Sequence, residues 1–293
     1  MQSITFTTLG ELLKAKREER NLSISELARV TGISKGVISK IETGETRRPE
    51  LRTINAIAEG IEMPKRDMIK KYIVIEKRTE VLYEILSQVI DSSDLELSTE
   101  IATLFLQSPE EDTYTSIERL YNLACSPILD ECKSALFAVI VKYARSHGIP
   151  HFLARGLLQT YLIERNDYKR LKDTYTMGQE IGHYVDFLSE EEKITYYFRM
   201  ALHAYSLRKD DECIKLCENG IKLEKKPTEL MARAYLAMIN TFVFMKNYDE
   251  VEKHLDVLVN FKYEFIFEAY LLTKAVLKVK KQQFEVAILD LSQ

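Results

Sequence analysis

The polar residues with the clearest common spacing lie in one short segment, residues 34–43, SKGVISKIET. Residues three and four positions apart share one face of a helix. In this segment one face carries Lys35, Gly36, Ser39, Lys40 and Thr43. Amine and hydroxyl groups suit hydrogen bonding to base edges, and a helix fits the roughly 12 Å major groove of DNA. The segment therefore predicts base contacts, and the basic residues of the following loop, Arg47 and Arg48, are predicted to bind the phosphate backbone.

Residue types that serve catalysis or metal binding are scattered along the chain. The five histidines are dispersed, and no glycine-rich phosphate loop occurs. Cys213 and Cys217 lie one helical turn apart and His203 precedes them, but no second CxxC or HxxxH pair accompanies them. The run SEEEK at 189–193 is typical of a charged helix start. We therefore expect no enzyme activity, no catalytic residue, no metal and no cofactor.

Capping and turn residues predict the helices that position the polar face. Thr8 is a predicted N-cap of a helix that ends near Arg20. The S-x-x-E pattern from Ser23 predicts a capping box for a short helix over 25–30. Gly32 supplies the turn, and Ser34 is the next N-cap. A helix over 51–59 closes the core. The residues of this pair of helices that we expect to face inward are Ile24, Leu27, Ala28, Ile33, Val37, Ile38 and Ile41.

The segments LARVTGISKGVISKIETGE and PELRTINAIAEGIEMP together resemble the Xre/Cro-type helix-turn-helix family, over about residues 8–66. The resemblance implies a DNA-binding domain over residues 1–66. The charged segment that follows contains no Gly/Ser-rich stretch, so a helical linker is expected over 67–75. The resemblance also implies an ion pair between Arg17 of the first helix and Glu42 at the end of the recognition helix. The alternative is a small helical bundle that binds another protein.

Composition predicts an all-α protein without a membrane partner. Strand-forming residues do not alternate for long, and the 293 residues include only ten glycines and six prolines. No apolar run approaches the roughly 20 residues of a membrane span, and the N-terminus has no signal-peptide pattern, so a cytoplasmic location is expected. Residues 1–72 carry 14 Lys and Arg against 10 Asp and Glu. The remainder of a chain with net charge −4 is therefore strongly acidic, and only the first part is expected to meet a polyanion.

The rest of the chain contains four similar turn segments. They are residues 165–171, 208–213, 246–251 and 282–287. Leu171, Cys213, Val251 and Ala287 then give spacings of 42, 38 and 36 residues. The sequence of each unit predicts a longer helix, a polar turn and a shorter helix. This arrangement resembles the tetratricopeptide repeat (TPR). We expect a right-handed TPR-like domain over residues 76–293, which serves peptide binding and dimerisation, with two further helical pairs between residues 75 and 150.

Stacked helical pairs form a concave surface that suits an extended peptide. With the alignment above, an amide such as that of Asn240 can donate to and accept from a peptide backbone, and Arg233 can bind a carboxylate. The candidate peptide-binding residues are Thr160, Thr195, Phe198, Tyr205, Arg233 and Asn240.

A helix-turn-helix domain followed by such repeats resembles the peptide-pheromone regulators of Gram-positive bacteria, the Rgg, PlcR and NprR group, with the phage arbitrium receptors as relatives. The resemblance implies a quorum-sensing transcription regulator. It would act as a homodimer that binds a double-stranded DNA operator and a short signalling peptide. Two alternatives stay open: the repeats bind a protein partner such as a phosphorelay component, or the protein is a ligand-independent repressor of phage or plasmid type.

Overall fold

The structure, a computed structural model, describes residues 8–90 and 94–280. These residues form sixteen α-helices and two short 3-10 helices, and no strand occurs among them. The protein is thus all-α, as its composition predicts. The chain divides into two compact units, residues 1–146 and 147–293, which are described separately below.

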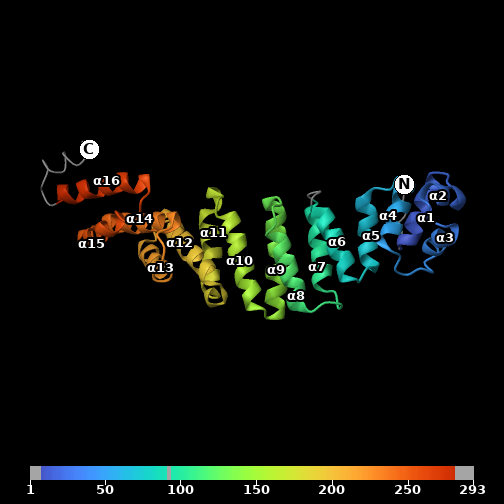
Figure 1. Cartoon of the computed structure of the whole chain (residues 1–293), viewed down its shortest axis with the longest axis horizontal. Helices are drawn as coiled ribbons and strands as arrows, with labels where there is room; N and C mark the ends of the chain where they lie inside the picture. Colours follow the sequence, from blue (N-terminus) through green and yellow to red (C-terminus); the bar gives the residue numbers. More distant parts are fainter. Residues whose placement is uncertain (1–7, 91–93, 281–293) are drawn as a thin grey trace. The chain divides into compact units, whose positions relative to one another are not determined.

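The first unit begins with four short helices that pack together (Figure 1). Their ends agree with the predicted caps: Thr8 and Ser23 each form a capping box with the glutamate three residues later, and Gly32 has a φ of 73° at the turn. Their buried core includes Leu13, Leu27 and Ile54. The helices are α1 (Leu9–Glu19), α2 (Ile24–Thr31), α3 (Lys35–Glu42) and α4 (Leu51–Gly60).

The next helix, α5 (Lys65–Ile75), packs against helices that precede it and against one that follows it. It contacts α1 and α4 before it and α7 after it. Four of its side chains, Met68, Ile69, Tyr72 and Ile73, are buried. The segment that we expected as a helical linker is therefore a helix with its own packed face.

Two helical pairs complete this part of the chain, in the interval where two were expected. In the first pair, α6 packs along α7, and α7 in turn contacts α8 (Figure 1). Large buried side chains such as Phe105 and Phe137 fill the space between helices. The helices are α6 (Thr79–Ile90), α7 (Leu95–Leu106), α8 (Thr113–Ala124) and α9 (Asp130–His147).

The second unit repeats the pattern of a longer helix, a turn and a shorter helix (Figure 1). Three of the four turn segments from the sequence fall between paired helices, and the fourth, 282–287, lies outside the described residues. The 3-10 helices are η1 (Tyr168–Arg170) and η2 (Val185–Phe187). The α-helices are α10 (Pro150–Glu164), α11 (Leu171–Gly182), α12 (Glu190–Ser206), α13 (Asp210–Leu223), α14 (Glu229–Phe244), α15 (Tyr248–Leu258) and α16 (Glu264–Lys280).

The core of the second unit lies between α12, α13, α14 and α15. Phe198 and Met238 are fully buried there, together with Cys217. Gly220 permits this packing, because a β-carbon at that position would lie 2.5 Å from the ring of Phe198. Cys213 and Cys217 are both free and buried, and within the described ranges no group of three or more His, Cys, Asp and Glu residues is arranged to hold a metal ion.

None of the helices within residues 8–90 and 94–280 combines the length and the apolar character needed to cross a membrane.

Candidate nucleic-acid interface and ligand surface

Caps at both ends of the turn fix the start of α3. Gly32 ends α2 in the left-handed conformation, and the Ser34 hydroxyl accepts from the Val37 amide at 3.4 Å. Ile38 and Ile41 are buried against the neighbouring helices. The N-terminal turn of α3 is thereby held at the surface, where Lys35, Gly36 and Val37 are exposed.

A buried ion pair fixes the other end of α3. Arg17 Nε donates to Glu42 Oε1 at 2.7 Å, and Arg17 Nη2 donates to Glu42 Oε2 at 2.8 Å. Arg17 Nη1 also donates to the carbonyl oxygen of Leu22 at 2.8 Å. Both residues of the pair are buried, so this two-pronged contact joins α1, the turn before α2 and the end of α3.

A close backbone approach accompanies this pair. A β-carbon at Gly10 would lie 2.3 Å from the carbonyl oxygen of Ile41, so only glycine allows α1 to approach the end of α3 this closely. By contrast, a β-carbon at Gly36 would meet no atom within 4 Å, because this glycine faces open space. The two glycines thus have different roles: Gly10 serves packing, and Gly36 leaves the outer face of α3 free of a side chain.

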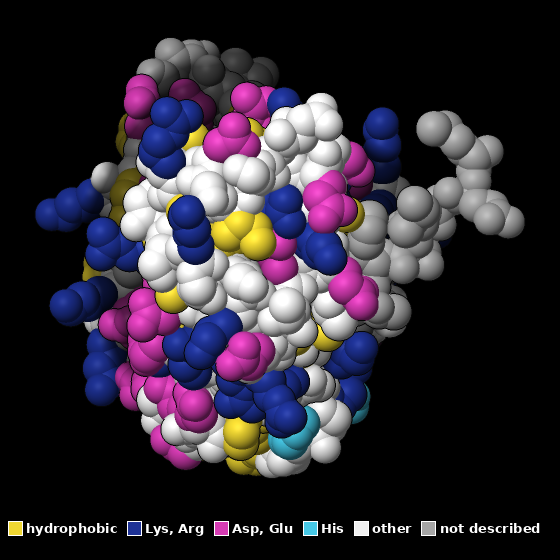
Figure 2. Space-filling model, turned by 90° about the vertical axis from the view of Figure 1, so that its right-hand side faces the viewer, with side chains coloured by type: hydrophobic (Ala, Val, Ile, Leu, Met, Phe, Trp, Pro, Cys, Tyr) yellow, Lys and Arg dark blue, Asp and Glu magenta, His cyan; other side chains and the backbone are white. Residues whose placement is uncertain are grey.

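The predicted polar face of α3 lies at the surface. Lys35, Gly36, Lys40 and Thr43 are exposed, and Ser39 is half-buried. The Thr43 hydroxyl donates to the carbonyl oxygen of Ser39 at 2.9 Å, and Lys40 lies 3.4 Å from the exposed carboxylate of Glu45. In the view of Figure 2, Lys and Arg side chains are interspersed with acidic side chains over the surface that is seen.

Val37 departs from the expected inward set. Leu27, Ile38 and Ile41 are buried, whereas Val37 is 41% exposed. Ile24, Ala28 and Ile33 are half-buried. The reason is that buried Glu42 belongs to the inner face of α3, so this face is centred on Ile38 and Val37 lies about 90° away from its middle. Val37 therefore joins the outer surface, where an apolar side chain suits contact with a thymine methyl group.

The loop after α3 carries the two predicted phosphate-binding residues. Arg47 and Arg48 are both exposed, and Pro49, which follows them, is buried. The amide of Thr46 donates to the carbonyl oxygen of Lys40 at 3.0 Å, which ties the loop back to α3. The loop is thus anchored on both sides of the two arginines.

The anchor at Pro49 belongs to a polar network that sequence reasoning missed. The Tyr72 hydroxyl lies 2.9 Å from the Pro49 carbonyl oxygen and 2.8 Å from Glu76 Oε2, and shares its single hydrogen between these acceptors. Arg78 Nη2 donates to Glu76 Oε2 at 2.6 Å and to the Pro49 carbonyl oxygen at 3.3 Å. The charged Glu-Lys-Arg run after the apolar stretch YIVI was the only signal of this network in the sequence.

Glu76 is ionised despite its burial. Only 1% of the residue is exposed, and burial by itself raises the pKa of its carboxyl. Hydrogen bonds from Arg78, Tyr72 and the Lys77 amide outweigh burial and lower the pKa to about 2. The same carboxylate holds the pKa of the Tyr72 phenol, which burial already raises, well above its usual range.

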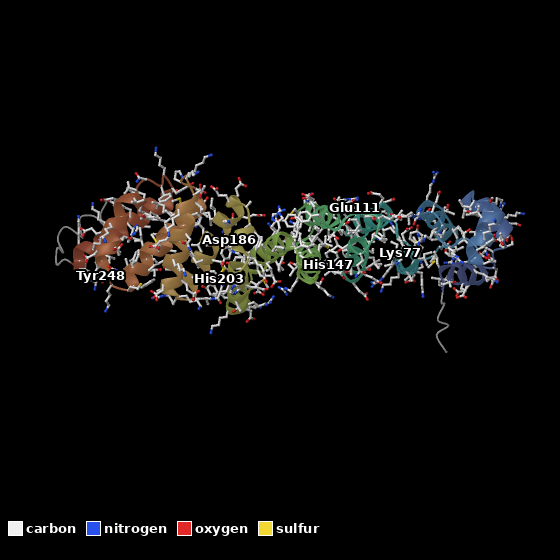
Figure 3. The ribbon with its side chains drawn as sticks, turned by 90° about the horizontal axis from the view of Figure 1, so that it is seen from below. Lys77, Glu111, His147, Asp186, His203 and Tyr248 are labelled. Carbon is white, nitrogen blue, oxygen red and sulfur yellow. The ribbon has the colours of Figure 1, made fainter. Side chains whose placement is uncertain are left out.

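The network continues into the helical pairs of the first unit. The Ser108 hydroxyl donates to the carbonyl oxygen of Lys77 at 2.8 Å and lies 2.6 Å from the hydroxyl of Thr79. The Thr79 amide donates to Glu110 Oε2 at 3.0 Å. Figure 3 labels Lys77 and Glu111, which mark the two segments that these bonds connect. A continuous chain of hydrogen bonds thus links the loop of Arg47 and Arg48 to the region between α7 and α8.

In the second unit, the candidate peptide-binding residues occupy α10, α12 and α14, the longer helices of their pairs. Thr195, Tyr205 and Asn240 are half-buried, and the structure shows no hydrogen bond of the Asn240 amide to another described residue. The Thr160 hydroxyl donates to the carbonyl oxygen of Gly156 at 3.0 Å, within its own helix.

Two candidates of this set differ in their surroundings. Arg233 is exposed, pairs with Glu229 at 2.7 Å and lies 4.6 Å from the centre of the Phe265 ring. Phe198 is fully buried in the core against Gly220, with no exposed atom surface to offer a ligand. The surface considered below therefore omits Phe198.

A buried histidine lies behind this surface. His203 Nε2 donates to the carbonyl oxygen of Leu171 at 2.8 Å, so its Nδ1, 3.2 Å from the Tyr161 hydroxyl, is an acceptor. Figure 3 labels His203 among the helices of the second unit. Burial lowers the pKa of this imidazole, and the positive charge of Arg165 lowers it further. His203 thus joins α10, α11 and α12 as a neutral side chain, with no arrangement for metal binding.

A polar helix that is exposed on one face, follows a capped glycine turn and is held on its inner face by the Arg17–Glu42 pair defines a DNA-binding helix-turn-helix protein. Comparison with known families agrees: the family model described as "Helix-turn-helix" matches residues 13–67. The HTH-type transcriptional repressor RghR of Bacillus subtilis (strain 168) is 32% identical over 130 residues, which cover 43% of this chain and 94% of that protein. The uncharacterized HTH-type transcriptional regulator RghRB of the same strain is 35% identical over 60 residues, 20% of this chain and 43% of that protein. The chain therefore belongs to the helix-turn-helix family of transcriptional regulators.

Solved structures of low similarity extend over most of the chain. Bacillus thuringiensis PlcR in complex with the peptide PapR7 and DNA is 15% identical, covers 95% of this chain and 99% of that chain, and gives a TM-score of 0.29. Apo ComR from Streptococcus vestibularis is 14% identical, covers 97% of this chain and 91% of that chain, and gives a TM-score of 0.29. Apo ComR from S. thermophilus is 16% identical, covers 96% of this chain and 90% of that chain, and gives a TM-score of 0.31.

Proposed function

We propose that this regulator binds a specific DNA operator through the outer face of α3 and that a short peptide, bound on α10, α12 and α14, controls this binding. The observation that carries the first part is the exposed face of Lys35, Gly36, Ser39, Lys40 and Thr43 on a helix whose opposite face is fixed by the Arg17–Glu42 pair. A rigidly held recognition helix can place side chains against base edges. Arg47 and Arg48 bind phosphate groups of the DNA backbone and so fix the position of this helix on the duplex.

The protein acts as a homodimer in this proposal. Two copies of α3 engage two half-sites when they lie about one turn of DNA apart, roughly 34–36 Å, or a multiple of it. A ligand that binds one arrangement of the dimer more tightly than another shifts the balance between them and so changes operator affinity. Because the DNA is in the cytoplasm of a bacterial cell, the protein is proposed to act there.

The peptide part of the proposal is supported by the resemblance of the whole architecture to peptide-pheromone regulators and by the polar side chains of α12 and α14. Asn240 and Thr195 are half-buried, and their side chains form no hydrogen bond with another described residue. A half-buried amide without a partner is costly to desolvate unless a ligand satisfies it, and an amide can both donate to and accept from a peptide backbone. Arg233, Tyr205 and Thr160 lie on the same three helices.

A second candidate function is a repressor that responds to no peptide. It is favoured by one specific observation: 94% of the length of a transcriptional repressor, RghR, aligns with 43% of this chain at 32% identity. In such a repressor the helical pairs would serve dimerisation or bind a protein partner such as a phosphorelay component.

One experiment separates these functions. The operator is first selected from a random pool of DNA duplexes, and peptides are selected from a random heptapeptide pool by retention on the immobilised full chain. Operator affinity is then measured by fluorescence anisotropy with and without the retained peptides. We expect a change of at least tenfold, which Asn240→Ala reduces while leaving operator binding without peptide intact. Operator affinity that ignores every retained peptide would instead support the repressor without a ligand.

A further inference from the structure

Three arginines lie on consecutive longer helices of the second unit. Arg165 is the C-cap of α10, Arg199 lies in the middle of α12 and Arg233 lies near the start of α14. Because α12 contacts both α10 and α14, the three residues belong to neighbouring helices. The charges of Arg165 and Arg233 both reach Arg199: together with burial, which has the largest effect, they lower the pKa of its guanidinium.

Two of these arginines have no acidic partner in the described part of the second unit. Arg165 and Arg199 are half-buried, and neither forms an ion pair or a side-chain hydrogen bond there. The carboxylates nearest to them in sequence are engaged elsewhere: Glu164 pairs with Arg170 at 2.9 Å, and Glu192 pairs with Arg155 at 2.8 Å. Half-buried like charges without a counter-ion oppose folding, so their grouping indicates a bound anion.

The remaining arginine can exchange its partner. Arg233 pairs with Glu229, but both side chains are more than half exposed, and exposed pairs within one helix contribute little to stability. A ligand carboxylate can therefore replace Glu229 at low cost. The guanidinium carbon of Arg233 also lies 4.6 Å from the centre of the Phe265 ring, a contact that does not need Glu229.

We propose that Arg165, Arg199 and Arg233 together bind a carboxylate, so that the ligand of this surface is an acidic peptide. This inference rests on the proposed peptide control and names the chemistry of the ligand. The planar guanidinium matches a carboxylate with two parallel hydrogen bonds. Nearby, the Tyr161 hydroxyl lies 3.3 Å from the backbone carbonyl oxygen of Arg199, which fixes the part of α12 that carries this arginine.

A peptide fits this site better than a nucleic acid does. Residues 1–72 carry the positive net charge of the chain, and the remainder has 27 Lys and Arg against 35 Asp and Glu. Residues 147–293 themselves carry 21 Lys and Arg against 22 Asp and Glu, so a long polyanion along the second unit would meet as many acidic as basic side chains, whereas a short peptide with one or two carboxylates meets only the three arginines.

The test uses the full chain and a random heptapeptide pool. The native chain, Arg165→Gln, Arg199→Gln and the control Lys222→Gln are immobilised, and retained peptides are eluted and sequenced by mass spectrometry. Lys222 is exposed on α13, so its substitution removes the same charge from outside the three-arginine group. Circular dichroism melting curves check that each variant is folded. Arg165→Gln, at a helix end, provides the test should Arg199→Gln reduce folding.

We expect Asp and Glu to be enriched about tenfold over the input at one or more positions for the native chain and for Lys222→Gln, since a hydrogen bond between charged groups contributes this much to affinity. Arg165→Gln and Arg199→Gln should each lose most of this enrichment. Peptides retained without acidic enrichment, or with the same enrichment by the arginine variants, would overturn the acidic ligand but leave peptide control in place.

Two further results would also overturn the inference, and each has a distinct meaning. If the native chain retains no peptide, the proposed peptide control is wrong as well. If Arg199→Gln weakens binding of a random-sequence DNA duplex as strongly as Arg47→Gln does, the arginines of the second unit bind DNA phosphates instead of a peptide.

Discussion

The hydroxyl of Tyr72 in α5 lies 2.9 Å from the carbonyl oxygen of Pro49, directly after the two exposed arginines of the loop behind α3. This contact joins the DNA-binding part of the chain to the helical pairs that follow, because Glu76 and Arg78 extend it towards Ser108 and Thr79. A change in the helical pairs that moves this network would also move the loop of Arg47 and Arg48.

Removal of the Tyr72 hydroxyl should weaken both stability and operator binding. In Tyr72→Phe, the buried Pro49 carbonyl and the Glu76 carboxylate lose a donor, so we expect the free energy of unfolding in urea to fall by about 1–3 kcal/mol. Operator affinity should fall as well, because the loop loses an anchor. Tyr83→Phe is the control, since no hydrogen bond joins the Tyr83 hydroxyl to another described residue. Equal effects of the two substitutions would contradict this role of Tyr72.

The ionised state of buried Glu76 makes stability depend on pH. Its folded-state pKa, about 2, lies below the ordinary value of 4.5, so the unfolded chain binds more protons than the folded one between these values. The contribution of Glu76 is therefore complete above about pH 5 and is lost as pH falls towards 2. It amounts to about 2 kcal/mol between pH 5 and pH 3. Urea unfolding at pH 5 and pH 3 measures this loss for the native chain and for Glu76→Gln. If the free energy of unfolding falls equally with pH in both, Glu76 is not the group responsible.

The ion pair of Arg17 and Glu42 should show strong coupling in a double-mutant cycle. Arg17→Met leaves a buried carboxylate without a partner and should lower the free energy of unfolding by about 3–5 kcal/mol. The double variant Arg17→Met with Glu42→Leu should recover much of this loss, because both charges are gone. Additive losses in urea unfolding would mean that the two side chains contribute independently.

The sequence predicted α1 to α4 well because caps and turns are local signals. The capping boxes at Thr8 and Ser23 and the turn at Gly32 all lie where the residue types indicate. The inner face of α3 was harder to predict. An apolar pattern alone assigned Val37 to the core, whereas Glu42, buried through its contact with Arg17, shifts the inner face away from Val37.

Contacts between distant segments gave no comparable signal. The Tyr72 hydroxyl and the Pro49 carbonyl are 23 residues apart, and nothing in either local sequence indicates their contact. The same holds for Arg165 and Arg199: the sequence indicated only Arg233 as a carboxylate ligand, and the packing of α10 and α14 on α12 brings Arg165 and Arg233 close enough for their charges to act on Arg199. Phe198 shows the reverse, since the repeat alignment placed it on the ligand surface, whereas its side chain lies in the core.

Gly36 offers a test in which stability and function change in opposite directions. Gly36→Ala adds a methyl group in open space on α3, so the free energy of unfolding should rise by about 0.5–1 kcal/mol. Operator affinity should fall, because the added group separates the helix from the DNA. The contrasting variant is Gly10→Ala, which must displace backbone atoms of Ile41 and should be destabilised. A more stable Gly36→Ala with unchanged operator affinity would remove Gly36 from the interface.

The most direct test of the central claim, that the outer face of α3 reads DNA sequence, is selection of duplexes from a random pool by the native chain, by Lys35→Ala with Ser39→Ala, and by Arg47→Ala. The account predicts that the native chain enriches two half-sites about one DNA turn apart. The double variant should lose or change this preference, whereas Arg47→Ala should keep the preferred sequence with weaker binding and a smaller salt dependence. No enriched sequence for the native chain, or the same sequence for the double variant, would contradict the account.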